Sequence, residues 1–90
     1  MFLPRSESRT GRNPFDGITW TVQVWNRPWP LSDWLVQATS EDIPGLKVRE
    51  PPASHKSLHK ARVDASWLYA TCMSALLREP WKPDKISPPR

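Results

Sequence analysis

The sequence has little cysteine, little glycine and no long apolar run. Its 90 residues include one cysteine, Cys72, and three glycines. A single cysteine excludes an internal disulfide bond, and with it the class of disulfide-stabilised secreted domains. No apolar run approaches the ~18–20 residues of a membrane-spanning helix, and the first residues lack the hydrophobic stretch of a signal peptide. We therefore expect a protein of the reducing cytoplasm without a membrane partner, although the Arg- and Ser-rich start leaves organellar import open.

The sequence also lacks a pattern that carries catalysis or holds a cofactor. There is no Gly-rich phosphate loop, because each glycine fits a turn, and the acidic residues are scattered. His55 and His59 have the i, i+4 spacing of two metal ligands on a helix, but two ligands do not make a site. Cys72 falls on an apolar helical stripe, where a buried structural thiol is expected. We expect no enzymatic activity, no cofactor and no metal.

The net charge of +4 is concentrated at the two ends of the chain. Residues 1–12 carry three arginines against one glutamate, and residues 80–90 carry three basic residues against one aspartate. Residues 13–79 are neutral, with seven basic and seven acidic residues. Because the ends lack apolar periodicity, we expect a flexible basic arm over 1–12, one small globular domain over 13–80 and a Pro- and Lys-rich tail over 81–90. Residues 1–12 and 82–90 are predicted to be disordered in the free protein.

Four of the six tryptophans lie within residues 18–34. Residues 18–25 alternate between apolar and polar side chains, which predicts a half-buried β-strand. The two prolines in Arg27–Pro30 then fix the backbone and remove two donors, so a corner must follow the strand. Ser32 is placed to cap a short helix over 33–42.

The second half of the chain predicts one more strand and a long helix. Residues 46–49 alternate, and we expect them to pair with the first strand. Apolar residues recur at helical spacing between 58 and 77, which predicts a helix over 55–79 that is capped by Ser54 and ended by Pro80. The expected fold is therefore α+β, a small antiparallel sheet of two or three strands packed against a long C-terminal helix. The alternative is a mostly helical fold with 18–25 as an extended arm.

Asn13–Asp16 (Asn-Pro-Phe-Asp), a strand ending at Asn26 and the sequence Ser32-Asp33-Trp34 together resemble the opening of MbtH-like proteins. In that family Asn-Pro-Phe-Asp leads into a strand ending in Asn, and Ser-x-Trp follows after the interval that separates Asn26 from Ser32 here. The sequence departs from the family at Pro44–Leu46, where the family has Pro-Ala-Gly-Trp. The resemblance implies a three-stranded sheet on a helix, no catalytic residues and activation of an adenylation domain of nonribosomal peptide synthetases. By this resemblance, Ser32 and Trp34 match family positions that contact the partner protein.

The excess of tryptophan over what a small core needs favours a non-catalytic accessory module or subunit that binds a larger protein or a multi-subunit assembly. The candidate partner-binding residues are Trp25, Trp29, Ser32, Trp34 and Trp81. The alternative is a small nucleic-acid-binding protein, in which basic side chains contact phosphates and nearby tryptophans stack on bases. The candidate residues for that alternative are Lys47, Arg49, Lys56, Lys60 and Arg62.

Overall fold

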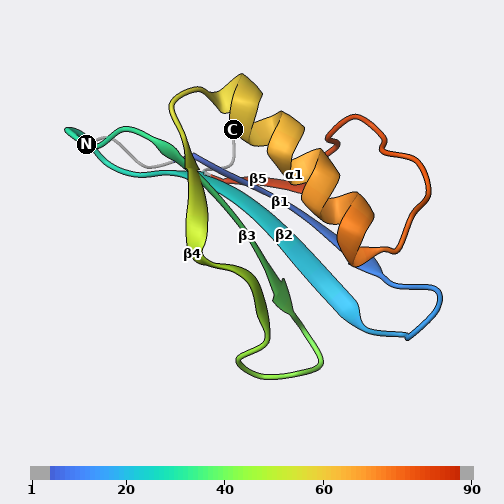
Figure 1. The fold of residues 1–90 in the computed structure, drawn as a ribbon. Helices are drawn as coiled ribbons and strands as arrows, with labels where there is room; N and C mark the ends of the chain where they lie inside the picture. The colour runs from blue at the N-terminus through green and yellow to red at the C-terminus, as the bar shows by residue number, and fades with distance from the viewer. Residues whose placement is uncertain (1–4, 88–90) are drawn as a thin grey trace.

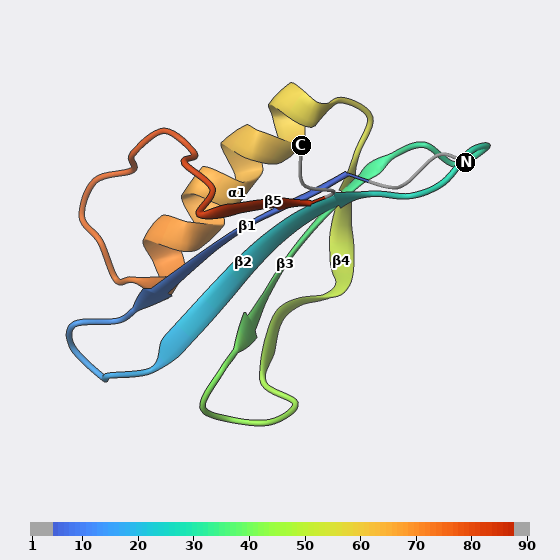
Figure 2. The same ribbon diagram turned by 180° about the vertical axis from the view of Figure 1, so that it is seen from behind.

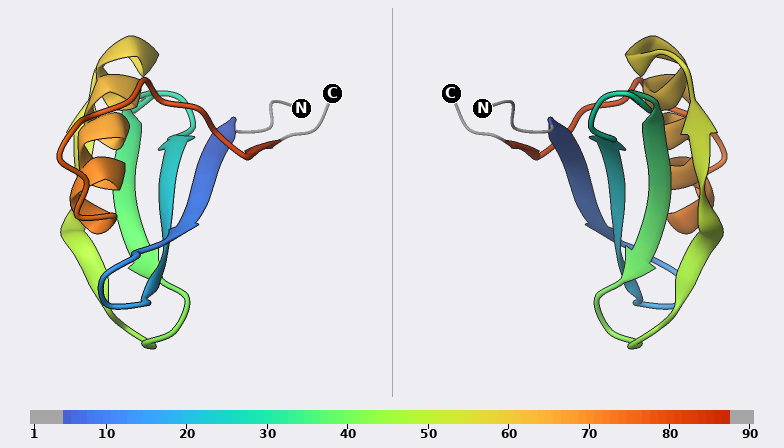
Figure 3. Two further views of the ribbon diagram at one scale, coloured as in Figure 1. Left: turned by 90° about the vertical axis from the view of Figure 1, so that its right-hand side faces the viewer. Right: turned by 90° about the vertical axis from the view of Figure 1, so that its left-hand side faces the viewer.

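A computed structural model describes residues 5–87 and shows two layers, a five-stranded antiparallel sheet and one helix on one face of it (Figures 1 and 3). In chain order the elements are β1 (Ser6–Arg12), β2 (Thr19–Asn26), β3 (Trp34–Ser40), β4 (Lys47–His55), α1 (Leu58–Cys72) and β5 (Lys85–Ser87). The strands lie side by side in the order β4-β3-β2-β1-β5. Seen from behind, the other face of the sheet is not covered by a helix of the described residues (Figure 2).

β2 lies at the centre of the sheet and supplies the middle of the core. Trp20, Val22 and Val24 alternate with polar residues, so all three side chains point to the same face and are buried there. This confirms the strand predicted over 18–25. Each valine removed from water stabilises the fold by roughly 1.5–3 kcal/mol. The buried apolar residues of sheet and helix are Trp20, Val22, Val24, Val36, Ala38, Ala61, Ala65, Leu68 and Cys72.

α1 begins later than predicted, because β4 continues through the two prolines of its sequence. β4 is an edge strand, where a proline without an N–H can be tolerated, and it runs as far as His55. The N-cap is Ser57, whose side-chain oxygen accepts a hydrogen bond from the backbone N–H of Lys60 at 3.1 Å. The prediction of Ser54 as the N-cap is therefore wrong.

Asn13 joins the turn between β1 and β2 to the end of α1. Its buried side-chain Nδ2 donates to the carbonyl oxygen of Cys72 at 2.8 Å and to Ser74 Oγ at 2.9 Å. Its Oδ1 accepts from the backbone N–H groups of Phe15 and Asp16. The last carbonyls of a helix need partners from outside it, and Asn13 supplies one. The chain leaves the helix at Ser74, where φ is 52° and the next backbone N–H, of Ala75, donates to the Ala70 carbonyl at 2.9 Å. α1 ends at Cys72 after 15 residues, so the helix predicted over 55–79 is too long.

The predicted sheet of two or three strands is wrong, because five strands are present. The helix predicted over 33–42 is β3, in which Trp34, Val36 and Ala38 face α1 while the residues between them face away. Ser32 does not cap a helix and lies instead in the loop before β3, with a φ of 53°. The mostly helical alternative is excluded by the same sheet. The strand predicted over 46–49 overlaps β4 from Lys47 onward, but β4 pairs with β3 and not with β2 as expected.

Both ends of the described chain also add strands. Ser6–Arg12 pairs with β2 along its whole length, where a flexible arm over 1–12 was predicted. Lys85–Ser87 pairs with β1. These residues belong to the Pro- and Lys-rich tail predicted over 81–90, in which residues 82–90 were predicted to be disordered. The parts of those two predictions that concern residues 1–4 and 88–90 lie outside the described residues. No helix within residues 5–87 is long and apolar enough to cross a membrane.

Candidate functional site

The loop between β2 and β3, residues Arg27–Asp33, is closed at its base by a set of polar contacts. Arg27 forms a bidentate ion pair with Asp33, with Nε–Oδ1 at 2.6 Å and Nη2–Oδ2 at 2.5 Å, and its backbone N–H donates to the Asp33 carbonyl at 2.9 Å. The Asn26 side-chain amide donates to the carbonyls of Ser32 and Asp33 at 3.1 Å. Hydrogen bonds from Arg27 and Ser54 keep the pKa of Asp33 well below its ordinary value. The carboxylate therefore stays charged and holds the loop closed at neutral pH.

This loop presents an apolar tip to solvent. Trp29 is 85% exposed and stands between Pro28 and Pro30, and the neighbouring Leu31 is also exposed. In Figure 1 the loop projects beyond the end of the sheet, away from α1. Proline fixes φ, so the backbone that carries the indole has little freedom to lose on binding. The tip combines a large apolar side chain with a constrained backbone.

The other candidate partner-binding residues lie in different surroundings. Ser32 is exposed in the same loop, and Trp25 is half-buried on the sheet face opposite α1. Trp34 is half-buried and packs against the core from the helix side of β3. Trp81 also packs against the core, and its Nε1–H donates to Glu7 Oε1 at 3.0 Å. The structure therefore brings Trp29 and Ser32 together in one loop, while Trp34 and Trp81 contribute to packing.

Glu7 is a buried carboxylate that sequence reasoning did not single out. It faces α1 from β1, where Arg62 binds it through Nε at 3.0 Å and through Nη2, and Arg5 Nη2 lies 3.0 Å from Oε2. Burial raises the pKa of Glu7, but the hydrogen bonds from Arg62 and Trp81 and the charges of the two guanidinium groups outweigh burial. The pKa is therefore lowered, and Glu7 is an anchor between β1, α1 and the chain before β5 and not a proton donor.

The basic residues of the nucleic-acid alternative do not form one free cationic surface. Arg62 binds Glu7, and Arg49 forms an ion pair with Asp64. Lys47 stands at the start of β4, whereas Lys56 follows its end, so these lysines lie at opposite ends of a nine-residue strand. Lys60 is exposed in the first turn of α1. A nucleic-acid surface built from these five residues would need the two arginines to leave their carboxylates.

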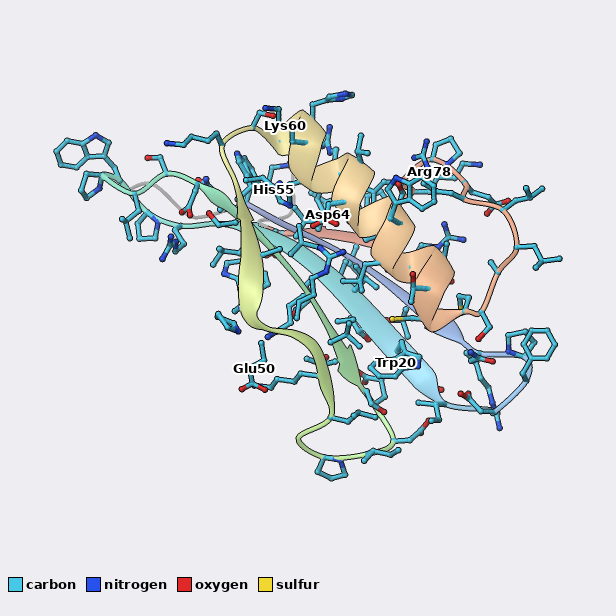
Figure 4. The ribbon with its side chains drawn as sticks, viewed as in Figure 1. Trp20, Glu50, His55, Lys60, Asp64 and Arg78 are labelled. Carbon is cyan, nitrogen blue, oxygen red and sulfur yellow. The ribbon has the colours of Figure 1, made fainter. Side chains whose placement is uncertain are left out.

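The histidine pair that resembled a metal site is divided between two elements. His55 ends β4 and its Nε2 lies 2.7 Å from Asp64 Oδ2, where the strand meets the helix (Figure 4), while His59 is exposed in α1. Within residues 5–87, no three histidine, cysteine, aspartate or glutamate side chains gather as metal ligands would. Burial raises the pKa of the Cys72 thiol to about 11, despite the opposing charge of Arg49. Cys72 is thus a protonated core residue at neutral pH.

The structure also shows a groove at the end of α1, which the sequence did not predict. It has a volume of about 770 Å³ and lies between the last turns of α1, the β1–β2 turn and the segment after the helix. Its apolar lining includes Phe15, Tyr69, Met73, Leu76 and Leu77. The sequence pattern is misleading here, because Leu76 continues the apolar stripe of the helix predicted over 55–79 and Leu77 lies alongside that stripe. In the structure they follow the helix and are exposed.

No family model matches this chain, and neither the curated proteins nor the solved structures include one with significant similarity to it. These comparisons leave the resemblance to MbtH-like proteins untested.

Proposed function

We propose that this protein is a non-catalytic binding module that attaches to a larger protein through the Arg27–Asp33 loop, with Trp29 as the central contact. The observation that supports this most strongly is the exposure of Trp29 on a loop that is already closed by the Arg27–Asp33 pair. Tryptophan is enriched among the residues that contribute most to protein interfaces. A constrained loop also loses little conformational entropy when it binds.

The partner is proposed to be a larger protein or a subunit of an assembly in a reducing compartment such as the cytoplasm. The MbtH-like resemblance suggests one partner class, the adenylation domains of nonribosomal peptide synthetases. Of the two residues that the resemblance carries over, Ser32 lies in the exposed loop beside Trp29 and is available for contact, whereas Trp34 is largely committed to the core.

The test is to capture partners from the native source with the tagged full chain, at low and high salt. The Trp29→Ala variant removes the proposed contact. Trp67→Ala is the matched control, because Trp67 is also exposed but lies on α1. Neither indole belongs to the buried core, so both variants are expected to fold.

The proposal predicts a stoichiometric protein partner that wild type and Trp67→Ala retain at both salts and that Trp29→Ala loses. Contacts with phosphate weaken steeply as salt increases, whereas an apolar contact through an indole changes little. Recovery of nucleic acid alone, and only at low salt, would support the nucleic-acid alternative and contradict the proposal. Retention of the same partner by Trp29→Ala would also contradict it.

A further inference from the structure

The segment Met73–Asp84, here called the strap, forms one wall of the groove and is fixed at both ends. At its start the Met73 backbone N–H donates to the Tyr69 carbonyl at 3.0 Å. At its end the Asp84 backbone N–H donates to the Ser8 carbonyl at 2.7 Å, and Asp84 Oδ2 accepts from the Thr10 backbone N–H at 2.8 Å. Between these anchors the strap arches past the end of α1 (Figures 1 and 2). The groove therefore lies beside a segment that is held in place.

Large apolar side chains around this groove are left exposed. Leu76 is 100% exposed, Leu77 82% and Phe15 80%, and all three line the groove. Scattered exposed apolar residues are normal, but several gathered around one concave surface mark an interaction site. A small molecule inside the groove would leave much of this apolar surface in water. A polypeptide segment can fill the groove and also cover the side chains at its rim.

The charged groups at the groove favour an acidic occupant. The Arg9 guanidinium lies 4.2 Å from the centre of the Tyr69 ring, and the Arg78 guanidinium lies 5.1 Å from the centre of the Trp67 ring. Neither arginine forms an ion pair with any residue in the range 5–87, although Arg78 Nη1 donates to Ser66 Oγ. Glu79 is the one acidic side chain among the lining residues. Two arginines beside an apolar groove that have no carboxylate partner within the described residues are complementary to carboxylates next to apolar side chains.

We infer that the groove binds a short acidic segment of a partner protein that carries two or more bulky apolar side chains. This inference rests on the proposed function, a protein-binding module, and assigns that module a second contact surface. The groove and the Arg27–Asp33 loop lie at opposite ends of β2, because the β1–β2 turn precedes Thr19 and the loop follows Asn26. A single extended partner, or two different partners, can therefore occupy both surfaces without competition.

The test is a selection of groove-binding peptides from a random peptide library displayed on phage, using the folded full chain as bait. Peptides that also bind the Leu76→Ser/Leu77→Ser double variant are discarded, so that only groove-dependent sequences remain. Both leucines are largely exposed, and circular dichroism of the variant checks that it folds. Dissociation constants of the selected peptides are then measured with wild type, with the Arg9→Gln/Arg78→Gln double variant and with Trp29→Ala.

The inference predicts groove-dependent peptides that are enriched in Asp or Glu and in bulky apolar residues. The two arginine substitutions are expected to raise their Kd by roughly tenfold, since together they remove two partly exposed ion pairs with the peptide. Trp29→Ala is expected to leave that Kd unchanged. Selection of neutral or basic peptides, or of none that depends on the groove, would overturn the inference. So would peptides that bind wild type and the arginine variant equally.

Two further outcomes separate this inference from the proposed function. If groove-dependent acidic peptides are selected but Trp29→Ala retains the native partner, the assignment of the Arg27–Asp33 loop fails and the groove inference stands. If capture depends on Trp29 but no groove-dependent peptide is found, the groove inference alone fails. Whether the groove binds a lipid instead of a peptide is tested in parallel, by nuclear magnetic resonance with sodium laurate. Shifts at strap amides with laurate, together with the absence of selected peptides, would assign the groove to a lipid and overturn the inference.

Discussion

Replacement of Glu7 by glutamine is expected to destabilise the domain, although the two side chains have nearly the same size. In the native structure Oε1 accepts from Arg62 and from Trp81, and Oε2 faces Arg62 and Arg5. A glutamine offers one acceptor oxygen and an NH₂ group that can only donate. That group would face two guanidinium groups, which also only donate. The substitution therefore removes a charge and leaves donors facing donors in a buried site.

The size of the effect follows from how much of this cluster is buried. Removal of one partner of a fully buried ion pair costs roughly 3–5 kcal/mol, because the other charge is left without compensation. Here Glu7 is buried, but Arg62 and Arg5 are partly exposed and can turn toward water. We therefore expect Glu7→Gln to lower the free energy of unfolding by about 2–3 kcal/mol. For a domain of this length the Tm falls by about 10–20 °C.

The assay is thermal and urea denaturation, followed by far-ultraviolet circular dichroism and tryptophan fluorescence. The matched control is Glu50→Gln, because Glu50 is an exposed carboxylate on β4 whose side chain forms no hydrogen bond within residues 5–87 (Figure 4). The control is expected to change the free energy of unfolding by less than about 0.5 kcal/mol. If Glu7→Gln is as stable as wild type, or if both variants lose the same amount, the anchoring role of Glu7 is refuted.

Three further predictions concern pH, the thiol and a capping side chain. Because the folded pKa of Glu7 lies below its ordinary value of 4.5, the stabilisation from this group is present above pH 4.5 and is lost as the pH falls through the folded pKa. Urea denaturation across acidic pH should show this loss in wild type and less of it in Glu7→Gln, and identical pH profiles would contradict it. Cys72, with its pKa raised to about 11, should react with a thiol reagent at neutral pH only after unfolding, and rapid labelling of the native protein would contradict its burial. Asn13→Ala should lower the free energy of unfolding by about 1–3 kcal/mol, because the Cys72 carbonyl at the end of α1 loses its buried hydrogen bond from the Asn13 side chain. A stability within experimental error of wild type would contradict this contribution of Asn13.

The central strand, β2, was predictable from sequence because its apolar and polar side chains alternate in a way that fits only a strand. β3 was not predictable in this way. Trp34, Leu35 and Ala38 fit one helical stripe, whereas Trp34, Val36 and Ala38 fit one face of a strand. The choice between these patterns depends on pairing with β2, which aligns Val36 with Val24 and Ala38 with Val22. Tertiary packing decided the conformation here, and that information is not local to the segment.

β1 could not be predicted from hydrophobic periodicity, because the residues that it turns toward α1 include Glu7 and Arg9. A charged residue at a core position is tolerated only with a partner, and Arg62 lies 55 positions away along the chain. The exposed tip at Trp29 was predictable, since two prolines forced a corner there. The groove was not, because the chain leaves the helix at Ser74, where φ is 52°, and Leu76 and Leu77 are therefore exposed. Helical spacing of apolar residues does not show that turn.

The proposal that Trp29 anchors a protein partner is tested most directly by the Kd of the purified complex, measured by isothermal titration calorimetry. A central interface residue contributes at least about 2 kcal/mol, so Trp29→Ala should raise the Kd by roughly 30-fold or more. Trp67→Ala should leave it unchanged. A Kd for Trp29→Ala equal to that of wild type, with the variant folded, would contradict the proposed role of the loop.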